Sequence, residues 1–128
     1  MKKKIRVCLM MGLCLCLSGM LSIVSAATKT KTVYFSLGSL TAQESIELTV
    51  NLDTLNKPSV KYTKSGTNGM YNNVWTTYNA IDNTLTKSIS ADTATYTIKS
   101  RAQWIDLNRN FHYSGYKNTT FSYSGSLS

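Results

Sequence analysis

Apolar and polar residues alternate along most of the chain after residue 26. Because successive side chains of a β-strand point to opposite faces, this alternation predicts strands with one buried face each. The alternating segments lie at 33–37, 46–52, 59–63, 85–89, 93–99, 111–113 and 121–123, with turn-forming residues between them. We therefore predict an all-β fold, a small antiparallel β-sandwich of about seven to nine short strands, with a small barrel as the alternative.

The segment 41–44, Thr-Ala-Gln-Glu, matches the capping box that opens many helices. The residues that follow argue against a helix, because Ile46, Thr49 and Val50 are β-branched and the apolar residues fall at every second position. We expect a strand here, and a single helical turn at 41–44 is the alternative.

The segment 93–107 is too long for one strand of a small sandwich, since at about 3.3 Å per residue it would extend roughly 50 Å. Its apolar residues occupy even positions from Ala94 to Trp104 and odd positions at Ile105 and Leu107. This change of phase predicts a bulge within 100–104 or a crossing between sheets.

Residues 1–26 have the pattern of a secretory signal peptide. Lys2, Lys3, Lys4 and Arg6 precede an apolar stretch, and Val24-Ser25-Ala26 supplies small residues for cleavage. We expect residues 27–128 to form a single secreted, extracellular domain, and the short basic start is typical of bacteria. The alternative is an uncleaved anchor, because 7–24 is about as long as the shortest membrane span; after cleavage we expect no stable membrane insertion.

Removal of this leader changes the composition that remains. The whole chain has a formal net charge of +8, and loss of its four basic residues leaves +4. All three cysteines, Cys8, Cys14 and Cys16, are lost as well. The exported domain is therefore cysteine-free, which excludes a disulfide scaffold, a cysteine nucleophile and a cysteine metal site.

The remaining titratable residues offer no recognisable catalytic arrangement. There is one histidine, His112, and no Gly-x-Ser-x-Gly motif accompanies it, so we expect an ordinary strand residue. Glu44 and Glu47 could form a glycosidase pair, but they face opposite sides of a strand; we expect solvated charges that discourage edge pairing. The sequence predicts no enzyme, no metal site and no cofactor.

Aromatic residues beside Asn and Thr are the positive chemical feature, because sugar-binding surfaces combine flat apolar rings with hydrogen-bonding groups. Alternation places Val74, Tyr78 and Ala80 on one face and Trp75 and Ile81 on the other. Trp75 is therefore expected outside the core. Tyr71 and Tyr116, each next to a turn, complete the predicted binding group of Trp75, Tyr71 and Tyr116.

The other tryptophan, Trp104, has the parity of Tyr96 and Ile98, and we predict that it is a core residue.

The expected function is a secreted, non-enzymatic module that binds a cell-surface glycan, a wall polymer or an extracellular protein. Nucleic acid is a poor candidate partner, because the protein is exported and its basic residues are scattered. The alternative is a small cationic secreted antagonist, bacteriocin-like, that acts at the envelope of a target cell.

Overall fold

The computed structural model describes residues 26–56 and 58–125, and these form eight antiparallel strands and no helix. The strands are β1 (Ala26–Leu37), β2 (Leu40–Asn51), β3 (Ser59–Gly66), β4 (Gly69–Tyr71), β5 (Val74–Ser90), β6 (Thr93–Asp106), β7 (Phe111–Tyr113) and β8 (Lys117–Ser124). The all-β prediction is confirmed, and 41–44 belongs to β2 rather than to a helical turn. Residues 1–25 of the predicted signal peptide lie outside the described residues.

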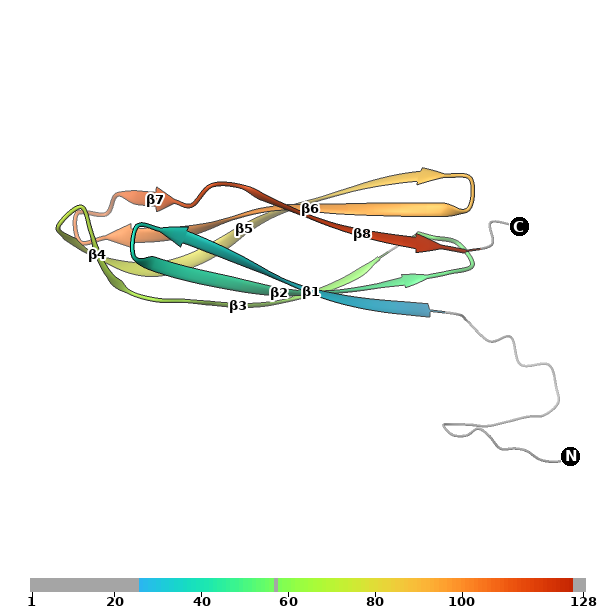
Figure 1. Ribbon diagram of the computed structural model, residues 1–128, viewed down its shortest axis with the longest axis horizontal. Helices are drawn as coiled ribbons and strands as arrows, with labels where there is room; N and C mark the ends of the chain where they lie inside the picture. The colour runs from blue at the N-terminus through green and yellow to red at the C-terminus, as the bar shows by residue number, and fades with distance from the viewer. Residues whose placement is uncertain (1–25, 57, 126–128) are drawn as a thin grey trace, which may run out of the picture.

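The strands form two sheets. The small sheet has the order β1-β2-β3, and the large sheet has the order β4-β5-β6-β7, with β8 also paired to β6. β6 is central to the large sheet, since residues 93–100 pair with β8 and residues 103–105 with β7. Figure 1 shows both sheets running along the long axis of an elongated molecule.

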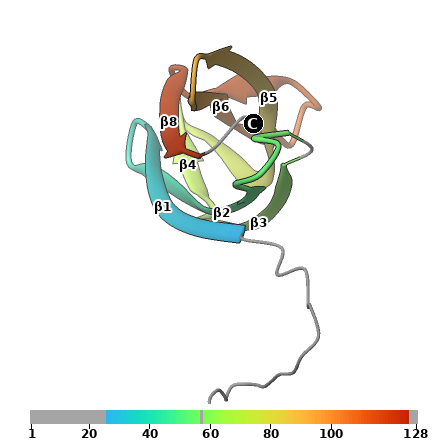
Figure 2. The ribbon, with the colours of Figure 1, turned by 90° about the vertical axis from the view of Figure 1, so that its right-hand side faces the viewer.

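Aliphatic and aromatic side chains fill the space between the two sheets, which face each other in the end-on view of Figure 2. Trp104 and Tyr96 are fully buried, which confirms the core prediction for Trp104. Their polar atoms are paired, as burial requires: Trp104 Nε1 donates to the carbonyl of Thr67 at 2.9 Å, and the Tyr96 hydroxyl to that of Leu55 at 2.6 Å. Side chains of the large sheet thus bond to backbone that follows the strands of the small sheet.

The first seam between the sheets lies where β1 faces β8. No strand pairing joins them in the described part of the chain, and two lysines span the gap instead. Lys29 Nζ donates to the carbonyl of Ser122, and Lys31 Nζ to that of Thr120 at 2.6 Å. These lysines occupy acceptors of an unpaired edge, which protects that edge from pairing with another chain.

The second seam lies where β3 faces β5, and its contacts are also made by side chains. Lys64 Nζ of β3 donates to the carbonyl of Ile81 in β5 at 3.4 Å. Farther along, the Tyr78 backbone N–H donates to Asn68 Oδ1 at 2.8 Å.

The prediction of a bulge within 100–104, or of a crossing between sheets, is wrong for β6. β6 continues to Asp106, and its even-numbered residues stay buried to the end. Ile105 therefore lies on the outer face, and Leu107 is 72% exposed. A long strand is accommodated because the molecule is elongated and because β6 pairs with β8 and β7 in succession.

The irregularity lies in the neighbouring strand, β5, where the register shifts between Tyr78 and Ala80. One extra residue in a strand reverses which parity faces the core. Ile81 is consequently buried, and the prediction that it shares the outer face with Trp75 is wrong.

Candidate functional site

Large apolar side chains gather on the outer face of the large sheet, toward the end formed by β4 and β7. We call these residues the outer patch: Met70, Trp75, Leu107, Phe111, Tyr113 and Tyr116, all of them exposed. Trp75 is 44% exposed. A contiguous exposed apolar surface is unusual for a soluble domain and is typical of a binding surface.

Strand register brings the apolar members of the outer patch together. Met70 of β4 is the direct partner of Trp75 in β5, and the Leu107 backbone N–H donates to the Trp75 carbonyl at 3.2 Å. In the next row, Phe111 of β7 lies opposite Ile105 of β6. Directly opposite residues on adjacent strands present their side chains to the same face, so these rows form one surface.

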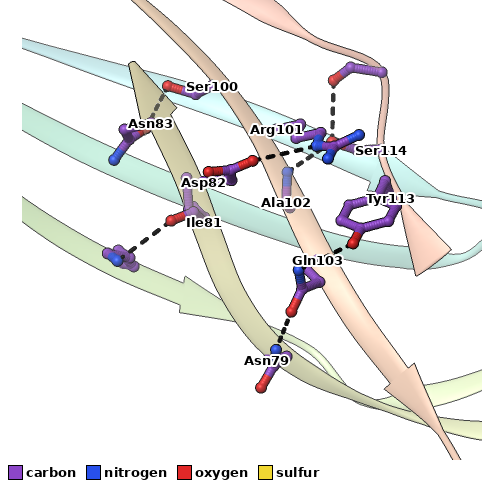
Figure 3. Close-up of polar contacts among 12 residues, drawn as sticks. Asn79, Ile81, Asp82, Asn83, Ser100, Arg101, Ala102, Gln103, Tyr113 and Ser114 are labelled. Atoms are coloured by element: carbon purple, nitrogen blue, oxygen red, sulfur yellow. Dashed lines mark hydrogen bonds and ion pairs between the residues drawn. The ribbon is translucent and has the colours of Figure 1, made fainter. Parts of the chain in front are cut away.

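Polar groups adjoin the Tyr113 ring on this face (Figure 3). Gln103 is the direct partner of Tyr113 and donates through Nε2 to its hydroxyl at 3.4 Å, while Asn79 Nδ2 donates to Gln103 Oε1. The guanidinium of Arg101 lies 3.8 Å from the centre of the Tyr113 ring and 4.8 Å from that of Tyr116. The site therefore combines flat apolar rings, amides and a cation held by two aromatic faces.

Asp82 partly balances the charge of Arg101, because its Oδ2 lies 3.5 Å from Arg101 Nε. Lys99 Nζ lies 4.5 Å from the centre of the Tyr116 ring. Positive charge thus borders the aromatic residues at this end of the face, which favours ligands that are neutral or anionic.

The hairpin tip at 106–110, next to the patch, is held by one carboxylate. Asp106 Oδ1 accepts hydrogen bonds from the backbone N–H groups of Asn108 (2.8 Å) and Asn110 (2.9 Å), and Oδ2 lies 2.8 Å from His112 Nε2. The hydrogen bond to His112 and those from the backbone lower the pKa of Asp106 to about 2. The Asp106 carboxylate therefore holds the turn that connects Leu107 to Phe111.

The three residues nominated from sequence are not all on this surface. Trp75 and Tyr116 belong to the outer patch, whereas Tyr71 lies on the opposite face of β4. Its ring is partly buried and packs 5.1 Å from the ring of His112. The tyrosine supports the tip from inside and is separated from Trp75 by the sheet.

Met70, Leu107, Phe111 and Tyr113 were not predicted as site residues from the sequence. The alternation at 111–113 did place Phe111 and Tyr113 together on one face of a strand, but it predicted that this face is buried. In the structure the face is exposed, and His112 points inward. No sequence signal places Met70 beside Trp75, because that neighbourhood depends on the strand register.

A second unexpected cluster is buried between the sheets. Glu44 is 0% exposed, so the expectation of a solvated charge is wrong for it. Its Oε2 accepts a hydrogen bond from Asn83 Nδ2 at 2.6 Å, and its Oε1 lies 3.2 Å from Ser100 Oγ. The Ser100 hydroxyl donates to Asn83 Oδ1 at 2.6 Å. Burial raises the pKa of Glu44, although these hydrogen bonds and the charge of Lys64 act in the opposite direction.

Hollows also lie away from the patch. One, of about 440 Å³, is lined by Tyr34 of β1 and by residues 41–43 and 65–67. Another, of about 340 Å³, follows the first seam between β1 and β8. Within 26–56 and 58–125, no group of three potential metal-binding side chains occurs and no helix is long and apolar enough to cross a membrane.

Comparison with protein-family models, with curated proteins and with solved structures gives no match for this chain.

Proposed function

We propose that the protein is a secreted, non-enzymatic β-sandwich module that binds a cell-surface glycan through its outer patch. The observation that carries the proposal is the exposed aromatic surface itself, with Trp75, Phe111, Tyr113 and Tyr116 on one sheet face. Sugar rings present flat C–H faces that stack on aromatic rings, and their hydroxyls bond to amides and guanidinium groups at the rim.

Rigidity of the platform supports this function. Trp75, Phe111 and Tyr113 project from paired strands, and Tyr116 directly precedes β8. The hairpin tip beside them is braced by the hydrogen bonds of Asp106. Arg101 is held between two tyrosine rings, so its guanidinium loses little further freedom when a ligand binds.

Sedimentation with purified cell walls and insoluble polysaccharides tests the proposal. The protein is produced from the full chain and recovered after export, and binding is measured for the wild type, Trp75→Ala, Phe111→Ala and Tyr34→Ala. Tyr34 is a matched control, because it is a 64% exposed aromatic on the small sheet. We expect Trp75→Ala and Phe111→Ala each to weaken binding about tenfold, which corresponds to roughly 1.4 kcal/mol.

The Tyr34→Ala variant also tests whether the ligand binds in the hollow beside Tyr34 instead. If Tyr34→Ala weakens binding while Trp75→Ala does not, the ligand occupies the hollow beside Tyr34 and the outer patch is the wrong site. If no wall or polysaccharide retains the wild type, the glycan-binding proposal is wrong.

A second candidate, a cationic antagonist acting at the envelope of a target cell, has support from the tip alone. Leu107 is the most exposed large apolar residue in the described chain, and the exposed Arg109 follows two residues later. An apolar side chain next to a cation suits the surface of an anionic membrane. Growth inhibition of related bacteria that is lost in Leu107→Ser would favour this function over glycan binding.

A further inference from the structure

Three side chains at the second seam have complementary reactivity. Lys64 of β3 is the direct register partner of Glu44 in β2 and shares its inward-facing parity, although it lies at the solvent-exposed edge. Asn83 of β5 contacts Glu44 from the opposite sheet at 2.6 Å. An amine, a carboxamide and a buried carboxyl therefore meet where the two sheets face each other without backbone pairing.

The hydrogen bonds of the Asn83 side chain suit a carboxamide that is attacked by a nucleophile. Its carbonyl oxygen accepts a hydrogen bond from the Ser100 hydroxyl at 2.6 Å, which polarises the Cγ–Oδ1 bond and can stabilise negative charge on Oδ1. Its amide nitrogen bonds to Glu44 at 2.6 Å, the position from which a carboxyl could protonate a departing nitrogen. Burial of Glu44, which raises its pKa, favours the protonated acid that this role needs.

The nucleophile is within reach of this group. Lys64 Nζ lies 3.4 Å from the carbonyl oxygen of Ile81, and Ile81 and Asn83 are successive inward-facing residues of β5. Such residues are about 6–7 Å apart along a strand, a distance that rotation of a four-carbon side chain covers.

We propose that Lys64 and Asn83 join in an intramolecular isopeptide bond, formed by the protein itself with Glu44 and Ser100 as catalytic residues. The Lys64 ammonium first gives a proton to the Glu44 carboxylate, which leaves a neutral amine and a protonated carboxyl. The amine then attacks Cγ of Asn83, and an electron pair moves onto Oδ1, where Ser100 donates its hydrogen bond. The Glu44 carboxyl gives its proton to Nδ2, the Cγ–Nδ2 bond breaks, and ammonia leaves. The Glu44 carboxylate then takes up the proton released by the Lys64 nitrogen.

The products are one amide linking Nζ to Cγ and one molecule of ammonia, so atoms and charges balance without an oxidant or reductant. The bond would tie β3 of the small sheet to β5 of the large sheet. It would give a cysteine-free exported domain the cross-link that a disulfide supplies elsewhere.

The intact mass of the protein, produced from the full chain and purified after its N-terminus is determined, tests the proposal directly. We expect a mass lower by one ammonia than the sequence predicts. Trypsin should fail to cut after Lys64, leaving residues 62–87 as a single peptide, because no other Lys or Arg lies between 64 and 87. Full calculated mass together with cleavage after Lys64 would overturn the proposal.

Asn68-Gly69 lies in the same peptide and can also lose ammonia, by forming a succinimide. Lys64→Arg separates the two reactions: the arginine keeps the charge but cannot form the amide, so the full mass should return. An ammonia loss that persists in Lys64→Arg would assign the modification to a succinimide and overturn the cross-link.

Asn83→Ala should likewise restore both the full calculated mass and cleavage after Lys64.

Glu44→Gln tests catalysis separately from folding. Glutamine can accept from Asn83 and donate to Ser100, so the variant should fold, which circular dichroism checks, yet it has no acidic proton to give. We expect Glu44→Gln to remain unlinked. A folded Glu44→Gln protein that still carries the bond would refute the role of Glu44.

Discussion

Asn83 Nδ2 donates a hydrogen bond of 2.6 Å to Oε2 of Glu44, and this bond joins the large sheet to the small sheet inside the core. When Glu44 is protonated, it can donate to Ser100 Oγ, which donates to Asn83 Oδ1, so the three side chains close a ring of hydrogen bonds. In such a ring each side chain is both a donor and an acceptor, so the buried polar atoms that form it all have hydrogen-bond partners.

This ring predicts a stability that falls as the pH rises. Burial raises the pKa of Glu44 above 4.5, so the folded state binds the proton more tightly than the unfolded state. The stabilisation is complete below pH 4.5 and is lost as the pH rises through the folded pKa. Glu44→Gln should remove this component.

Denaturant titrations of Lys64→Arg and of the double variant Lys64→Arg/Glu44→Gln measure the effect without the proposed cross-link. The difference in unfolding free energy should grow in favour of the double variant between pH 4.5 and neutrality. Parallel pH profiles would contradict the prediction.

Asp106 should give the stability of the protein the opposite dependence on pH. Its pKa falls from 3.8 to about 2 because His112 and the backbone of the tip bond to the carboxylate. The stabilisation is complete above 3.8 and is lost as the pH falls through about 2. Asp106→Asn should therefore flatten the acid limb of the stability profile, measured by denaturant titration between these values. An unchanged acid limb would show that the tip contributes nothing.

The two tryptophans should differ in their effect on stability. Trp104 is fully buried, so Trp104→Ala should cost about 3–5 kcal/mol by opening a cavity, enough to prevent folding of a domain of ordinary stability. Trp75 is 44% exposed, and Trp75→Ala should cost about 1 kcal/mol or less. Urea unfolding of both variants provides the measurement, with Trp104→Phe as the milder core change. Equal, large losses would mean that Trp75 is structural.

Gly66 packs against the ring of Tyr78, which in turn meets Trp104 edge to face at 6.0 Å. A Cβ at this position would lie 2.3 Å from Tyr78 Cδ1, so the ring must move. We expect Gly66→Ala to cost about 1–3 kcal/mol in unfolding free energy. Gly115→Ala is the control, since a Cβ there meets nothing within 4 Å, and thermal melts should separate the two variants.

Part of the site was predictable from sequence. Trp75 was predicted to be exposed because its parity is opposite to that of Val74 and Tyr78. The structure agrees, since Val74 and Tyr78 are partly buried and Trp75 is exposed. Parity also placed Ile81 on the outer face, which is wrong, because a single extra residue in β5 turned Ile81 inward. Parity is a local property that holds only until the next bulge.

The alternation of apolar and polar residues by itself determined the all-β class and the core position of Trp104, because burial of one strand face requires period two. It did not reveal the short strand β4 or the unbroken length of β6. Only the tertiary structure decided which strands are neighbours. That pairing placed Met70 beside Trp75 and Phe111 beside Ile105, and it brought Asn83 and Ser100 to the buried carboxyl of Glu44. Parity places Glu44 on the same face as Ile46 and Leu48. The energy that can hold its carboxyl inside the core comes from partners distant in the chain, and the sequence near Glu44 does not identify them.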